Sequence, residues 1–204
     1  MIIPTYEQAK QYEKDYTYIP VCREILADDV TPILMLRKLA ALDGQYFLLE
    51  SVEGGNLGRY SFLGYHPKLS VSCKNGVVKV KENGMVRILP GKPKEALQSL
   101  LEQYRSPQIE GLPTFTGGLV GYFAYETIQY AEPKLHIKQS DVNDFELMMF
   151  DKLLAFDQVM HKLCIIVNAR TADGEAGYNK AVEEIDAFIE TLRITEPIPY
   201  EKPQ

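Results

Sequence analysis

Hydrophobic and polar residues recur with two different periods along the chain, and the change of period separates helical from strand-rich stretches. In 32–43, 93–104 and 174–193 the apolar residues return every three to four positions, which is typical of a helix with one buried face. Between these stretches, short apolar or alternating runs are bounded by glycine, proline and asparagine. We therefore expect an α+β protein with a largely antiparallel, sandwich-like β-sheet and flanking helices.

Local signals mark where the helices begin. Thr5 and Gln8 have the spacing of a capping box, so a short helix is expected after Thr5. Thr31 is placed to cap a second helix whose first residue is Pro32, a position at which the missing N–H of proline costs nothing. Pro93 opens a third helix in the same way.

Tight turns connect several of the expected strands. Asn75-Gly76 and Asn83-Gly84 suit type I′ hairpin turns, in which both central residues need a positive φ. The strands that the pattern predicts are 17–26, 46–51, 59–65, 69–74, 77–81, 86–89, 115–123, 145–157 and 162–168.

Composition and charge narrow the classes of function. With 204 residues, 46% of them hydrophobic, the chain can bury a core without cross-links. The net charge of −6 and the scattered Lys and Arg residues argue against a nucleic-acid partner. No apolar run is long enough for a membrane span, and no leader pattern begins the chain. Cys22, Cys73 and Cys164 are far apart, which is typical of reduced thiols, so we expect a cytoplasmic protein.

A carboxylate beside a hydroxyl, at the end of an apolar strand, is the clearest chemical signal. Glu50 and Ser51 end this strand, and the Gly-rich loop 53–59 follows. A free amino acid needs an acceptor for its ammonium group and a donor for its carboxylate, which Glu50 and Ser51 can supply. The simpler interpretation, solvated polar residues at a strand end, stays open.

Other runs point less clearly to a site. The loop 53–59 lacks both the Walker and the dinucleotide fingerprints. Arg59 could donate to an anion, but we expect it at the surface with its stem stacked on Tyr60. The run 115–126, with three glycines, predicts either a crowded strand or the wall of a substrate cleft. None of the three histidines has metal-ligand spacing and no nucleophile motif appears, so we assign no catalytic and no metal-binding residue.

Taken in order, several stretches resemble the N-terminal part of anthranilate synthase component I, a chorismate-utilising enzyme family. The resemblance runs from about residue 17 to 192. The stretches that carry it are 18–21, 31–32, 47–64 and 113–126, and 146–168 is similar as well.

This resemblance implies a regulatory and structural domain, residues 1–194, and a Pro-rich linker, 195–204, toward an absent C-terminal chorismate-binding domain. The family makes anthranilate from chorismate with ammonia from a glutamine amidotransferase subunit (component II), needs Mg²⁺, and is inhibited by L-tryptophan. Leu49, Glu50 and Ser51 match part of its tryptophan-binding element, with Ser51 the foremost candidate. The catalytic groups and magnesium carboxylates match nothing in this chain, so neither catalysis nor a cofactor is expected of the chain alone.

Two alternatives stay open. Component I of aminodeoxychorismate synthase has a related fold and holds tryptophan as a structural ligand, although the wording of 50–55 favours the anthranilate branch. A standalone amino-acid-binding module, without an enzyme partner, would bind tryptophan by itself.

Overall fold

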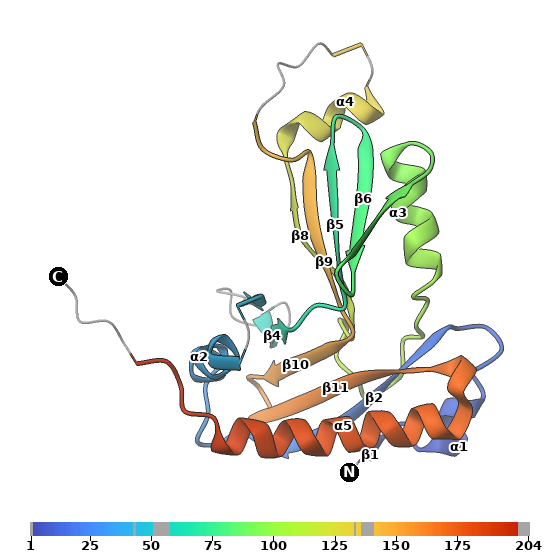
Figure 1. Cartoon of the computed structure of the whole chain (residues 1–204). Helices are drawn as coiled ribbons and strands as arrows, with labels where there is room; N and C mark the ends of the chain where they lie inside the picture. Colours follow the sequence, from blue (N-terminus) through green and yellow to red (C-terminus); the bar gives the residue numbers. More distant parts are fainter. Residues whose placement is uncertain (1, 43, 51–57, 133, 136–140, 200–204) are drawn as a thin grey trace. The chain divides into compact units, whose positions relative to one another are not determined.

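The chain forms two compact units, each built around its own antiparallel sheet. The computed structural model describes residues 2–42, 44–50, 58–132, 134–135 and 141–199 (Figure 1). The first unit comprises 1–66, 105–117 and 151–204, and the second comprises 67–104 and 118–150. Antiparallel sheets with flanking helices confirm the α+β class expected from the sequence.

In the first unit, the sheet has the strand order β1-β2-β11-β10-β4-β3, and every neighbouring pair is antiparallel. Its strands are β1 (Ile2–Ile3), β2 (Tyr18–Leu26), β3 (Tyr46–Leu49), β4 (Tyr60–Tyr65), β10 (Lys152–Asp157) and β11 (Lys162–Arg170). Its helices are α1 (Tyr6–Lys10), α2 (Pro32–Leu42) and α5 (Gly174–Ile194), with the short 3₁₀ helix η3 (Thr171–Asp173) before α5.

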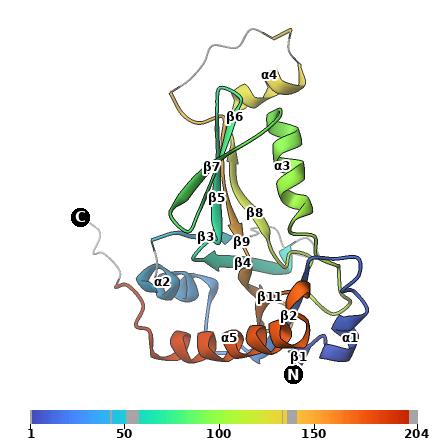
Figure 2. The ribbon, with the colours of Figure 1, turned by 45° about the vertical axis from the view of Figure 1, so that its right-hand side comes forward.

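The core of the first unit lies between one face of this sheet and the helices α2 and α5 (Figure 2). Leu39 of α2, Ile165 of β11 and Ile185 of α5 are each fully buried there. Alternate residues of each strand point to this core, because successive side chains of a strand face opposite ways. The other face of the same strands is largely covered as well, because Leu153 and Ile166 alternate with the core residues and are also buried.

In the second unit, the strand order is β7-β6-β5-β9-β8, again antiparallel throughout. The strands are β5 (Leu69–Lys74), β6 (Val77–Glu82), β7 (Met85–Leu89), β8 (Gly118–Phe123) and β9 (Phe145–Phe150). Helix α3 (Pro93–Glu102) buries Ala96 and Leu100 in the core of this unit. The short helices η2 (Tyr125–Thr127) and α4 (Ile128–Ala131) follow β8.

The local signals in the sequence are confirmed where they concern caps and turns. Thr5 and Gln8 form the capping box, and Thr31 Oγ1 accepts a hydrogen bond from the main-chain N of Leu34 at 3.2 Å. Asn75, Gly76, Asn83 and Gly84 all have positive φ. Within the described residues, no helix has the length and apolarity to cross a membrane.

The single long strand predicted over 145–157 is wrong. The chain leaves the second sheet after Phe150 and enters the first sheet at Lys152. Asp151 lies at the break, and its carbonyl accepts hydrogen bonds from the main-chain N and the Nδ2 of Asn168, at 2.9 and 3.1 Å. These bonds come from β11, far along the chain, so an unbroken apolar run could not reveal them.

Candidate functional site

The residues expected to bind an effector lie at the end of β3. Leu49 is the last residue of the strand and is 47% exposed, although it is a leucine. Glu50 follows outside the strand and is exposed to solvent. Among the described residues, the strand predicted over 46–51 ends at Leu49, because Glu50 is not part of the ladder with β4. Ser51 lies outside the described residues.

Aromatic side chains lie beside Leu49 on the same face of the sheet. Phe62 of β4 is directly opposite Leu49 in the antiparallel register. The Phe62 ring packs edge-on against Phe115, with 5.5 Å between centroids, and lies 5.8 Å from the ring of Tyr60. The end of β3 therefore borders an apolar, aromatic surface, which is the kind of wall that a hydrophobic amino-acid side chain needs.

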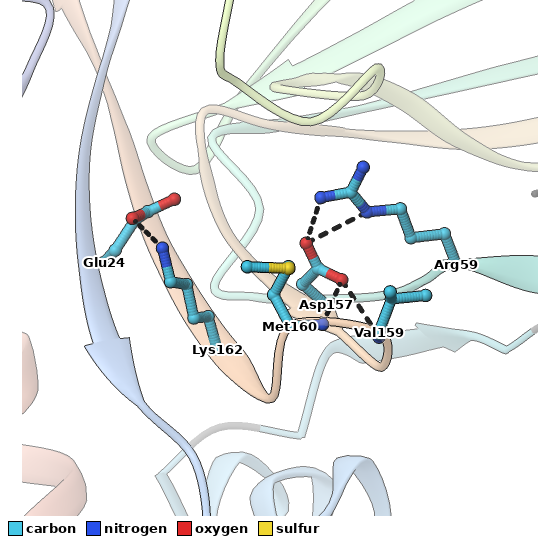
Figure 3. Close-up of polar contacts among 6 residues, drawn as sticks. All are labelled: Glu24, Arg59, Asp157, Val159, Met160 and Lys162. Atoms are coloured by element: carbon cyan, nitrogen blue, oxygen red, sulfur yellow. Dashed lines mark hydrogen bonds and ion pairs between the residues drawn. The ribbon is translucent and has the colours of Figure 1, made fainter.

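An ion pair with one buried partner anchors the start of β4. Arg59 donates from Nε and Nη2 to Asp157 Oδ2, at 3.0 and 2.6 Å (Figure 3). The Asp157 side chain is 5% exposed, whereas that of Arg59 is 42% exposed. Arg59 also lies over the Tyr60 ring, 5.0 Å from its centroid, which confirms the stacking expected from the sequence. Nothing in the sequence pointed to Asp157, because no local signal connects two residues 98 positions apart.

Asp157 also holds the turn between β10 and β11. Its Oδ1 accepts hydrogen bonds from the main-chain N–H groups of Val159 and Met160, at 3.1 and 3.0 Å (Figure 3). Gln158 then binds the beginning of β4, because its main-chain N donates to the Arg59 carbonyl at 2.9 Å. We call this set of groups the Asp157 node. Its members are Arg59, Ser61, Asp157, Gln158, Val159 and Met160, with Gln158 Nε2 donating to Ser61 Oγ at 2.8 Å.

The charges of the node are balanced. Burial tends to raise the pKa of Asp157, but the hydrogen bond from Arg59 and the two N–H groups of the turn outweigh it, and the pKa is lowered below its ordinary value. On the same face, Lys162 pairs with Glu24 at 2.9 Å, joining β11 to β2 (Figure 3). That carboxylate raises the pKa of Lys162. Asp157 and Lys162 are therefore both charged at neutral pH.

Asp157→Asn is expected to destabilise the chain by about 2 kcal/mol at pH 7, since hydrogen bonds to charged groups contribute about 1.5–3 kcal/mol and Arg59 is half solvated. The pKa of Asp157 is depressed on folding, so its stabilising effect is complete above about pH 5 and is lost as the pH falls through the folded pKa. Urea unfolding of the parent protein and of Asp157→Asn at pH values from 7 to 3 should give free energies of unfolding that converge in acid. A penalty that stays constant or grows in acid would contradict this expectation.

The part of the chain that the structure describes contains no group of three or more His, Cys, Asp or Glu side chains that could hold a metal ion. The described cysteines, Cys22, Cys73 and Cys164, are all buried and free.

Comparison with known proteins gives a consistent set of relatives. No family model matches the chain. It is 36% identical over 190 residues to anthranilate synthase component 1 of Acetivibrio thermocellus, a match that covers 91% of this chain and 38% of that protein. It is 33% identical over 210 residues to the protein of the same name from Synechocystis sp., a match that covers 98% of this chain and 41% of that protein. The chain thus spans about two fifths of the length of the curated relatives it matches.

A solved structure is similar in fold. The crystal structure of anthranilate synthase component I from Streptococcus pneumoniae TIGR4 aligns with a TM-score of 0.56 and 24% sequence identity. The alignment covers 85% of this chain and 37% of that chain. At this identity the likeness concerns the fold alone.

Proposed function

Because the chain is homologous over about nine-tenths of its length to anthranilate synthase component 1, as its motifs predict, we propose that it is the N-terminal part of such an enzyme. Residues 1–194 are then its domain, and 195–204 link it to a C-terminal chorismate-binding domain. The whole protein would convert chorismate and ammonia to anthranilate and pyruvate, a lyase reaction of tryptophan biosynthesis in the cytoplasm. The 37–42% coverage of the relatives supports a partial chain.

In this proposal the chain regulates the reaction and does not catalyse it. Leu49, Glu50 and Ser51 contribute part of a feedback site for L-tryptophan. The observation that carries this assignment is the exposure of Leu49 and Glu50 beside the aromatic ring of Phe62. Glu50 would accept hydrogen bonds from the tryptophan ammonium group, while Leu49 and Phe62 would contact its indole ring. The remaining wall of the site belongs to the chorismate-binding domain.

Inhibition would follow from a shift between two arrangements of the whole enzyme. Tryptophan can shift this equilibrium only if it binds one arrangement more tightly, and a site shared between two parts of the protein meets this condition. The arrangement that closes the site around tryptophan would be the one that turns over chorismate poorly.

The proposal also assigns partners to the whole enzyme. A component II subunit, a glutamine amidotransferase, would supply the ammonia. Magnesium would be held by carboxylates of the chorismate-binding domain. The described residues of this chain gather no metal-ligating group, so no magnesium step is assigned to them.

Ser51→Phe in the full-length enzyme is the direct test. A phenyl ring in place of a hydroxyl would occupy the space of the ligand and remove a donor for its carboxylate, so we expect the tryptophan concentration for half-inhibition to rise at least about tenfold, since a lost tenfold in affinity corresponds to about 1.4 kcal/mol. Anthranilate formation is measured against tryptophan, relative to the uninhibited rate of each variant.

Ser99→Phe is the matched control for this test. Ser99 is exposed on α3 in the second unit, so the same substitution there should leave inhibition unchanged. Unchanged inhibition in Ser51→Phe would reject the site assignment. Identification of the product, anthranilate or aminodeoxychorismate, would decide between the two branches of the superfamily.

A further inference from the structure

The end of β3 depends on β4 for its position. Among the described residues, β3 is the edge strand of its sheet and pairs on one side only, with β4. Its four residues run from the pair Tyr46–Tyr65 to the pair Leu49–Phe62. This four-residue edge strand also packs against α2, but its described ladder is with β4 alone, so the position of Leu49 depends on where β4 lies.

The beginning of β4 extends beyond β3. Tyr60 and Ser61 precede Phe62, the last residue that β3 pairs with, and they pair instead with Asp157 and Phe156 of β10. This is the stretch that the Asp157 node holds. Three groups hold this stretch in place: the Arg59 side chain binds Asp157, and the Arg59 carbonyl and the Ser61 hydroxyl each accept a hydrogen bond from Gln158.

The two carboxylate oxygens of Asp157 bind two different parts of the chain. Oδ2 accepts hydrogen bonds from the guanidinium of Arg59, and Oδ1 accepts them from the two N–H groups of the β10–β11 turn. The turn is therefore already capped without Arg59, and the Arg59 bond has a separate effect, which is to tie the start of β4 to that turn. A buried carboxylate with four such bonds is a rigid support, because moving it would leave a charge unpaired in the interior.

We propose that Asp157, acting through Arg59, is a positioning residue for the effector site at the end of β3. It fixes the start of β4, and through the Leu49–Phe62 pair it fixes the apolar and carboxylate groups that would contact tryptophan. This inference rests on the proposed function of that site. It predicts that inhibition is sensitive to the node although no atom of Asp157 contacts the ligand.

Two variants of the full-length enzyme test the inference. Arg59→Met removes the link between β4 and the turn but leaves the turn capped, and because the Arg59 side chain is 42% exposed, solvent can take over part of its contact with Asp157. Asp157→Asn weakens both the link between β4 and the turn and the capping of the turn itself. We expect at least a tenfold rise in the tryptophan concentration for half-inhibition in each variant, with kcat and KM for chorismate within twofold of the parent when tryptophan is absent. Arg59→Lys keeps the positive charge but not the paired donors of the guanidinium, so its inhibition by tryptophan should lie between that of Arg59→Met and that of the parent enzyme.

Lys162→Met is the matched control. It breaks the neighbouring Lys162–Glu24 ion pair on the same face but leaves the node intact, so inhibition should be unchanged. The inference is overturned if Arg59→Met is inhibited normally while Ser51→Phe resists tryptophan, and the proposed function then stands. It is also overturned if the Arg59 and Asp157 variants lose kcat in the absence of tryptophan to the same degree as they lose sensitivity to tryptophan. Normal inhibition in both Arg59→Met and Ser51→Phe would reject the proposed effector site itself.

Discussion

Gly121→Ala is expected to lower the free energy of unfolding of the second unit by about 4 kcal/mol or to prevent it from folding. A Cβ built on Gly121 would lie 2.0 Å from the Glu146 carbonyl oxygen and 2.8 Å from the Leu147 Cα. Both atoms belong to the backbone of β9, which is paired on its other side with β5 and cannot move away from β8 without breaking that pairing. Overpacking a core with side-chain neighbours costs about 1–3 kcal/mol, and a clash with backbone should exceed this range.

Gly44→Ala controls for the loss of glycine as such, because no heavy atom lies within 4 Å of a Cβ at Gly44. Its stability should change by less than about 1 kcal/mol, since alanine there chiefly reduces the freedom of the unfolded chain. Urea unfolding of the two variants, followed by circular dichroism, makes the comparison. If both had the midpoint of the parent protein, the close approach of β8 and β9 at Gly121 would be disproved.

The fit of β8 against β9 also bears on the glycine-rich run 115–126. The sequence left open whether this run is a crowded strand or the wall of a cleft. At Gly121 the neighbouring backbone lies too close for any side chain, as a crowded strand requires. The cleft-wall interpretation stays a prediction.

Local signals made much of the secondary structure predictable. The turns at Asn75-Gly76 and Asn83-Gly84 and the capping box at Thr5 depend on a few adjacent residues, and each is present as expected. The break at Asp151 depends instead on Asn168, and the helices over 125–131 are too short to show a period. Such features are set by tertiary pairing, which a single sequence does not display.

The same limit applies to the candidate site. The pattern identified Glu50 and Ser51 as polar groups at a strand end, and the resemblance added Leu49. The structure places Leu49 at the exposed end of β3 and Glu50 directly after it, while Ser51 lies outside the described residues. Arg59 was expected to stack on Tyr60 and to be a possible anion donor, but the sequence did not show that its partner is Asp157. Partners on different strands are found by knowing the strand order, and the order β10-β4-β3 is what brings this carboxylate close to the site.

Ile185→Ala is expected to cost the first unit about 3–4 kcal/mol, because Ile185 is fully buried between α5 and the sheet. Lys180→Ala, at an exposed position of the same helix, should change stability by less than about 0.5 kcal/mol. Ile185→Val separates the two possible causes. Loss of packing predicts the order Ile, Val, Ala, with valine costing about 0.5–1.5 kcal/mol, whereas helix propensity alone would favour alanine over valine. Urea unfolding midpoints that placed alanine above valine would mean that α5 is held by its own backbone preference and not by the sheet.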